Sequence, residues 1–218
     1  MKGLLVKDFK IIFRVQRFTM LMMLAFLICF GYMGMASMTM GYMVFLAVFI
    51  SVNTISYDEF NNGTLFLFTL PFERKEYVAG KYVLGILLGI MGAVISFLAV
   101  IIMTVIRNKP VEWAEYLFTI LILLAVSILM LAVALPIHLA FGMVHGRYIT
   151  LLFYVAIGVL GTNALIRLEE FGIAREEIAL WFQGSKGVPL VILAVAVYLI
   201  CMAVSYMISL RIVEKKDL

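Results

Sequence analysis

Hydrophobic residues gather into six long runs along the chain, separated by short segments that hold most of the charged residues. Most of the runs reach about 17–25 residues, the length that an α-helix needs to cross the hydrocarbon core of a bilayer. Backbone polar groups in lipid must be satisfied within the segment itself, so these runs predict helices. The second run is the weakest, because it is short and interrupted by polar residues. The predicted spans are residues 19–37, 40–56, 82–106, 116–141, 148–166 and 188–210.

A different pattern opens the chain at residues 1–17. Four basic residues recur at spacings of three and four between Lys7 and Arg17, and four apolar residues between Leu5 and Phe13 occupy another face of the same helix. A basic amphipathic helix is typical of a segment that lies in the membrane interface. The alternative is a positive flank that only sets the orientation of the first span. Both interpretations place the N-terminus in the cytoplasm.

The composition supports a membrane protein. The 218 residues are 65% hydrophobic and 14% charged, with a mean hydropathy of +1.14, whereas soluble domains have roughly 45–50% apolar and about 25% charged residues. We therefore predict an all-α, polytopic membrane protein that forms a single transmembrane domain over residues 1–218. The net charge of +4 is modest, and the positive charges flank apolar runs instead of forming one basic face. This distribution predicts no nucleic-acid partner.

The positive charges also predict the topology. With the N-terminus inside, the inner segments carry twelve Lys and Arg residues and the outer segments carry five, which together account for all 17. Cytoplasmic loops of membrane proteins are enriched in Lys and Arg, which is known as the positive-inside rule. Six spans with both termini in the cytoplasm agree with this rule. Residues 57–81 then face the cytoplasm. Residues 167–187 form the large outer loop, where we expect one or two short amphipathic helices.

Residues 57–81 are the longest polar segment on the inner side. Two acidic residues open the segment, and the turn signal at residues 61–64 follows them. Pro71 ends a short apolar run and suits the first position of the third membrane helix. Glu73 suits the positive end of that helix dipole. We expect this segment to be the main contact between the membrane domain and the cytoplasm.

No catalytic motif is present, and we predict no catalytic, cofactor-binding or metal-binding residue. A phosphate-binding loop of the GxxxxGK[ST] type is missing, because Gly80-Lys81 is followed by Tyr82 and lacks the upstream glycine. No carboxylate lies in the middle of a span, which disfavours an ion-coupled carrier. His138 and His145 are seven residues apart and share a helix face, as metal ligands would. The stronger interpretation places His145 in a short inner loop and lets His138 bond a carbonyl freed by Pro136.

Several residues are candidates for contact with a transported molecule. Eight of the 15 methionines fall between Met20 and Met43, and methionine suits surfaces that accept varied apolar ligands; the alternative is packing or contact with lipid. Asparagines within the spans favour interhelical hydrogen bonds over direct ligand contact. The candidate substrate path is Met22, Met33, Met43, Asn53 and Asn163.

A ladder of small residues marks the third span. Gly85, Gly89 and Ala93 recur at four-residue spacing, a pattern that lets two helices approach closely. Packing within the subunit is the favoured use, and a dimer contact is the alternative.

Residues 57–81 resemble the permeases of the type-2 ABC exporter family. The opening MKGLLVKDFK resembles the N-terminal interfacial helix of that family, and Leu135-Pro136 and Phe141-Gly142 also fit its pattern. Span number, orientation and the outer loop agree, so the resemblance covers the whole chain. The residues of the polar segment that carry it are Glu59, Asn62, Gly63, Thr64, Leu70, Pro71, Arg74, Gly80 and Lys81.

The resemblance implies a subunit of a larger machine in a bacterial plasma membrane. Two permeases, which we expect to be a homodimer, would form the pathway in contact with membrane lipid, and two ABC ATPase subunits would bind ATP and magnesium. The polar segment would form a cytoplasmic coupling helix between spans two and three that docks on the ATPase. The substrate would be an amphipathic peptide or another hydrophobic molecule. The predicted ATPase contacts are Asp58, Glu59, Phe60, Asn61, Asn62, Gly63, Thr64, Leu65, Phe66, Phe68 and Arg74.

Two other functions remain open at this point. Six spans without a catalytic motif also suit a secondary carrier or channel that works without an ATPase. A membrane protein that senses peptides or confers immunity to them is the second alternative. Transport that strictly requires a partner ATPase would separate the exporter from both.

Overall fold

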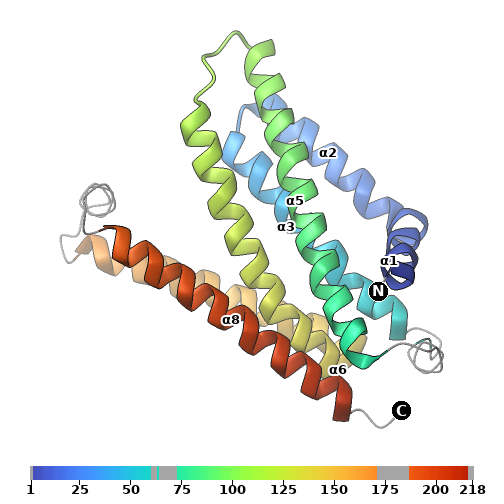
Figure 1. The fold of residues 1–218 in the computed structure, drawn as a ribbon. Helices are drawn as coiled ribbons and strands as arrows, with labels where there is room; N and C mark the ends of the chain where they lie inside the picture. The colour runs from blue at the N-terminus through green and yellow to red at the C-terminus, as the bar shows by residue number, and fades with distance from the viewer. Residues whose placement is uncertain (1, 60–62, 64–72, 171–186, 216–218) are drawn as a thin grey trace.

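The computed structural model describes residues 2–59, 63, 73–170 and 187–215, and this part of the chain is helical with short connecting turns and no strand (Figure 1). The predicted all-α class is therefore confirmed for the described residues. The helices are α1 (Lys2–Val15), α2 (Arg17–Met33), α3 (Ala36–Glu59), α5 (Arg74–Ile106), α6 (Trp113–Glu170) and α8 (Gly187–Lys215).

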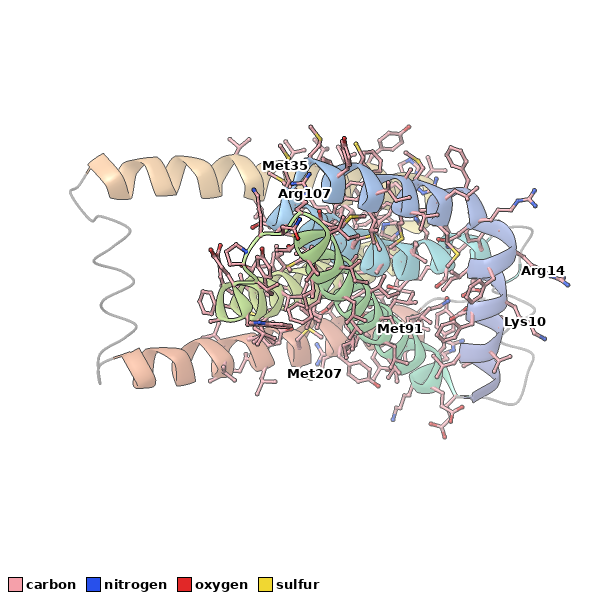
Figure 2. The ribbon with its side chains drawn as sticks, turned by 90° about the horizontal axis from the view of Figure 1, so that it is seen from above. Lys10, Arg14, Met35, Met91, Arg107 and Met207 are labelled. Atoms are coloured by element: carbon pink, nitrogen blue, oxygen red, sulfur yellow. The ribbon has the colours of Figure 1, made fainter. Side chains whose placement is uncertain are left out.

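Helix α1 lies across one end of the bundle, and Figure 2 shows Lys10 and Arg14 projecting away from the other helices. The chain bends by 71° between α1 and α2. The Gln16 side chain is buried at this bend and donates a hydrogen bond from Nε2 to the Ile50 carbonyl, at 3.3 Å. Ile12 is 1% exposed and packs with residues of α3 and α5. This arrangement agrees with the amphipathic helix expected from residues 1–17.

Helix α3 is the centre of the bundle, and small residues let α5 approach it closely. A Cβ added to Gly92 would lie 2.7 Å from the Ala47 Cβ, and one added to Gly89 would lie 3.1 Å from Val48 Cγ2. Larger side chains at these positions would force the two helices apart. The close packing predicted from the small-residue ladder thus occurs within the subunit.

Helix α6 contains two helical parts that meet at Gly142, where the chain reverses direction (Figure 1). Gly142 has φ 71° and ψ −169°, a conformation that favours glycine because it has no Cβ. Pro136 lies inside the first part without ending it. The predicted inner loop around His145 and Arg147 is wrong, because a turn at Gly142 suffices and both residues are helical.

Four helical segments of the described chain are long and apolar enough to cross a membrane, and counting the bent α1–α2 pair as one span gives five. Helix α2 has only 17 residues, and the apolar segment Val144–Ile157 is also shorter than the other spans. The six-span layout therefore remains a prediction. Helix α6 extends to Glu170, into the expected outer loop. The rest of that loop, residues 171–186, and most of the expected coupling helix lie outside the described residues. The four segments are Ala36–Glu59, Arg74–Ile106, Trp113–Gly142 and Val195–Lys215.

Candidate functional site

Four charged side chains meet where α1, α3 and α5 come together. Lys7 Nζ lies 2.5 Å from Asp58 Oδ1, and Lys81 Nζ lies 2.7 Å from Asp58 Oδ2. Asp8 completes the group, with carboxylate oxygens 2.9 Å from Lys81 Nζ and 3.2 Å from Lys7 Nζ. Each carboxylate thus has two ammonium neighbours, and the formal charges cancel. We call these four residues the ion cluster.

Burial makes the ion cluster structurally important. The side chains of Asp8, Asp58 and Lys81 are 2–3% exposed, whereas that of Lys7 is 28% exposed. A buried charge is tolerated only when it is paired and hydrogen-bonded. Removing one partner of a buried pair costs about 3–5 kcal/mol, because the other charge is left uncompensated. The three helices are therefore held in one relative position at this end.

Hydrogen bonds complete the ion cluster. The Tyr77 hydroxyl donates to Asp58 Oδ2 at 3.1 Å. Lys81 Nζ donates to Thr54 Oγ1 at 2.9 Å, and the Thr54 hydroxyl donates to the Ser51 carbonyl at 2.6 Å. The Lys81 ammonium also lies 5.4 Å from the centre of the Tyr77 ring, within cation–π range. The Asp58 carboxylate and the Lys81 ammonium are thus hydrogen-bonded by neighbours on several sides.

The last residue of α3 reaches the turn inside α6. A Cβ added to Gly142 would lie 3.0 Å from Glu59 Oε2 and 3.6 Å from Oε1, so the carboxylate sits directly at this turn. The second part of α6 begins here, and a negative charge is favourable near the N-terminus of a helix. Glu59 therefore links α3 to the reversal of α6.

The first residue of α5 holds the end of α8. Arg74 Nη1 donates to the carbonyls of Val213 and Glu214, at 3.0 Å and 2.6 Å. Carbonyls of the last helical turn lack partners within their own helix, and a cation is favourable there. Residues 60–73 are thus flanked by contacts to α1, α5 and α6 on one side and to α8 on the other.

The predicted ATPase contacts divide into four groups. Asp58 is 4% exposed, so its carboxylate faces the ion cluster and is not available on the surface. Glu59 and Arg74 lie at the two ends of the polar segment in the contacts just described. A Cβ added to Gly63 would lie 2.7 Å from the Asp58 carbonyl oxygen, which explains a glycine at this position. The remaining residues lie outside the described part of the chain, namely Phe60, Asn61, Asn62, Thr64, Leu65, Phe66 and Phe68.

The methionines of the candidate substrate path lie in different environments. Met22 and Met33 are 40% and 58% exposed on α2, about 16 Å apart along the helix axis at 1.5 Å per residue. Met43 is buried, and its carbonyl oxygen would lie 3.1 Å from a Cβ on Gly92. Asn53 is half-buried on α3. Asn163 is helical, and its side chain is not among those that the structure describes.

His138 is 1% exposed, and neither ring nitrogen has a hydrogen-bond partner among the described residues. The expected bond to a carbonyl freed by Pro136 is therefore wrong. A Cβ added to Gly146 would lie 3.1 Å from the His138 Cα, so the second part of α6 packs closely over the histidine. His145 is exposed. No group of three or more His, Cys, Asp or Glu residues suitable for a metal occurs in the part that the structure describes.

Sequence reasoning did not find the ion cluster. The sequence pattern places Lys81 at the end of the polar segment 57–81 and predicts Asp58 as an ATPase contact. Asp8 was the informative signal, as a single acidic residue in the basic helix 1–17. Ionisable residues at the edges of apolar segments commonly pair with one another. Their pairing across 51 and 73 residues of sequence becomes visible only in the fold.

The apolar helices and the buried charges at their ends define an integral membrane protein. Residues 3–214 match the family model described as "ABC-2 family transporter protein", so the chain belongs to that family. The resemblance found in the sequence is thereby confirmed. Membership implies a role in membrane transport with an ABC ATPase as partner. No curated protein and no solved structure is significantly similar to the chain.

Proposed function

We propose that this protein is the permease subunit of an ATP-driven exporter, and that its ATPase docks on residues 60–73 from the cytoplasm. One observation carries the proposal. The helix ends that flank this segment are tied to α1, α5, α6 and α8 through Asp58, Glu59 and Arg74. A force applied to the segment would therefore act on most of the bundle at once.

The contacts define how the coupling would work. Closure of two ATPase subunits would displace the docking segment, and the ion cluster would carry this displacement to α1 and α5. Glu59 would carry it to the Gly142 turn, and Arg74 to the end of α8. Packed helices with two stable arrangements convert such a displacement into a discrete change of state. The change would alternate access between the two sides of the membrane.

The proposed substrate is hydrophobic or amphipathic, and an amphipathic peptide is the first class to test. Met22 and Met33 are exposed on the outside of the subunit, where methionine suits contact with varied apolar ligands. A second copy of the chain would place two such surfaces opposite each other. We therefore propose a homodimer with the pathway between its subunits and two ATPases on the cytoplasmic side.

Co-purification with the ATPase tests the docking segment. We expect the double variant Phe66→Ala/Phe68→Ala to reach the membrane normally but to lose the ATPase, because aromatic residues are typical anchors of an interface. Phe118→Ala is the control, since Phe118 is 68% exposed near the start of α6, at the end of the bundle opposite the ion cluster. Full retention of the ATPase by the double variant would contradict the proposed docking site.

Reconstitution tests the energy source. Proteoliposomes that contain the permease and the ATPase should move a labelled amphipathic peptide only with ATP and magnesium. An ATPase variant that binds but cannot hydrolyse ATP is the control. Flux through the permease alone would favour a carrier or channel, and peptide binding without stimulation of the ATPase would favour a sensor.

A further inference from the structure

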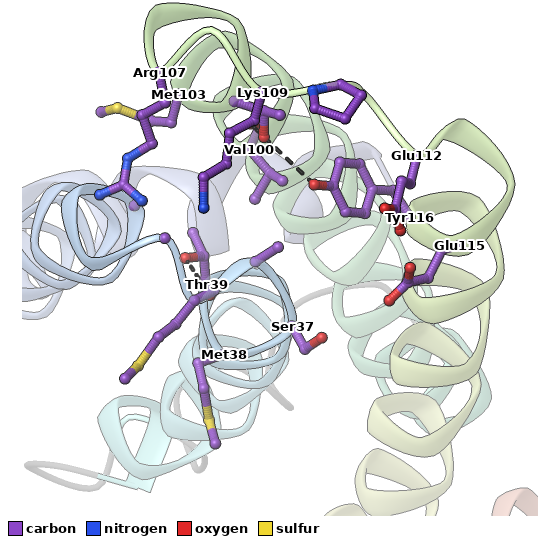
Figure 3. Close-up of a pocket in the computed structure, with 16 residues that line it drawn as sticks. Ser37, Met38, Thr39, Val100, Met103, Arg107, Lys109, Glu112, Glu115 and Tyr116 are labelled. Atoms are coloured by element: carbon purple, nitrogen blue, oxygen red, sulfur yellow. Dashed lines mark hydrogen bonds between the residues drawn. The ribbon is translucent and has the colours of Figure 1, made fainter.

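A second polar site lies at the opposite end of the bundle from the ion cluster. A cavity of about 430 Å³ opens there (Figure 3), and this volume falls in the range of roughly 300–1,000 Å³ that small-molecule sites occupy. Three parts of the chain line it. They are the end of α2 with the following turn and the start of α3, the last turns of α5, and the residues that lead into α6 with its first turn.

One side of the cavity is positive. Arg107 and Lys109 line it, and Figure 3 shows the Lys109 side chain extending into the space. The Arg107 guanidinium lies beside Gly34, at the C-terminal end of α2, and 6.0 Å from the centre of the Tyr32 ring. Arg107 therefore also stabilises the end of α2. Lys109 follows α5 in a loop, and its ammonium forms no ion pair with the described residues.

The other side is negative. The carboxyl groups of Glu112 and Glu115 lie next to each other in Figure 3, close enough to interact directly. Neighbouring like charges destabilise each other. Glu115 stands in the first turn of α6, where the helix dipole favours it, whereas Glu112 precedes the helix. Within the described chain, neither carboxylate pairs with Lys109 or Arg107.

The position of the cavity indicates which kind of molecule would carry a negative group for the positive side and a positive group for the negative side. The cavity lies where α2 and α5 end and α6 begins, and the ends of membrane-spanning helices are expected at the level of the lipid head groups. Met35, Met38 and Met103 supply an apolar wall beside the charged residues. A phospholipid whose head group carries a phosphate and an ammonium group matches this combination of charges and apolar surface.

We propose that the cavity binds the head group of a zwitterionic phospholipid with a primary ammonium group, the phosphoethanolamine class. The phosphate would bind Lys109 with help from Arg107, and the ammonium would bind Glu112 and Glu115. An acyl chain would follow the methionines. A primary ammonium has three hydrogen-bond donors for the carboxylates, whereas the trimethylated ammonium of a choline head group has none. This site does not depend on the ATPase or on the transported substrate.

Lipid binding to the purified protein tests the proposal. Native mass spectrometry in detergent would compare lipids with identical acyl chains and phosphoethanolamine or phosphocholine head groups. Hydrogen bonds to charged groups predict about a tenfold preference for phosphoethanolamine. Glu112→Gln/Glu115→Gln should remove most of this preference, because phosphoethanolamine loses both the charge attraction and the charged hydrogen bonds, whereas phosphocholine loses only the charge attraction. Lys109→Met should weaken both lipids, because both carry a phosphate.

Two controls and three results complete the test. Lys10→Met and Glu214→Gln change exposed charges at the other end of the molecule and should leave both affinities unchanged. Equal binding of the two lipids to the natural protein would overturn the proposal, and so would an undiminished preference after the double glutamine change. Equally tight binding of glycerophosphoethanolamine, which lacks acyl chains, would identify a soluble zwitterion as the ligand and would also overturn it.

Discussion

Replacing Lys81 by Met gives the sharpest test of the structure. The substitution keeps the length and apolar stem of the side chain but removes the ammonium from the buried ion cluster. Asp8 and Asp58 would then share Lys7 alone, which lies 3.2 Å and 2.5 Å from their nearest oxygens. One buried negative charge remains uncompensated, so we expect a loss of about 3–5 kcal/mol in unfolding free energy.

A double-mutant cycle separates charge balance from packing. Asp58→Asn alone leaves an excess positive charge, whereas Asp58→Asn combined with Lys81→Met leaves the balanced pair of Lys7 and Asp8. We therefore expect the double variant to be more stable than the sum of the two single losses predicts, with a coupling energy of about 1–3 kcal/mol. Equilibrium unfolding in mixed micelles measures all three variants, and Lys10→Met serves as the exposed control.

Two results would refute this reasoning. A loss below about 1 kcal/mol for Lys81→Met would match an exposed ion pair and would mean that the charges are solvated. Strict additivity of the two single changes would mean that Asp58 and Lys81 do not interact. Either result would also remove the main support for coupling through the ion cluster.

Three further substitutions test other contacts between the helices. Gly142→Ala should destabilise the protein by about 1–3 kcal/mol, because φ 71° with ψ −169° is a conformation that essentially only glycine adopts, and the new Cβ would lie 3.0 Å from Glu59 Oε2. Thermal unfolding measures this loss, and Glu59→Ala should relieve only its steric part. Arg74→Ala should speed amide hydrogen exchange in the last turn of α8, because two carbonyls lose a charged donor; unchanged exchange would argue against the clamp. Gly92→Ala should cost about 1–3 kcal/mol by overpacking. Ala47→Gly should restore part of this loss, since the two Cβ atoms would lie 2.7 Å apart, whereas the Met43 carbonyl oxygen stays 3.1 Å from the new Cβ; equal losses with and without Ala47→Gly would place the strain elsewhere.

The helices could be predicted from the sequence because the hydrophobic effect and the bilayer act on every residue of a run. Helices α3, α5 and α8 include the predicted spans 40–56, 82–106 and 188–210, and the small residues of α5 correctly predicted close packing. The turn between the fourth and fifth spans was less predictable. A single glycine with a positive φ reverses the chain there, and nothing in the polar pattern distinguishes this from a short loop around His145.

The two polar sites depend on contacts between distant residues and could not be predicted in the same way. Lys81 and Asp8 are separated by 73 residues, and their pairing follows from the crossing of α1 over the bundle end. Arg107, Lys109, Glu112 and Glu115 lie close in sequence, but only the fold shows that they line a cavity with the end of α2. The methionines between Met20 and Met43 show only that this region is rich in methionine. Their positions in the sequence do not show which of their side chains face one surface.

The cancellation of charge in the ion cluster has an electrical consequence. Moving one elementary charge through the membrane field requires about 2.3 kcal/mol per 100 mV. Two ammonium groups and two carboxylates that move together carry no net charge, so their displacement does almost no electrical work. The ion cluster therefore adds no voltage dependence of its own to a transport cycle that displaces it together with α1, α3 and α5.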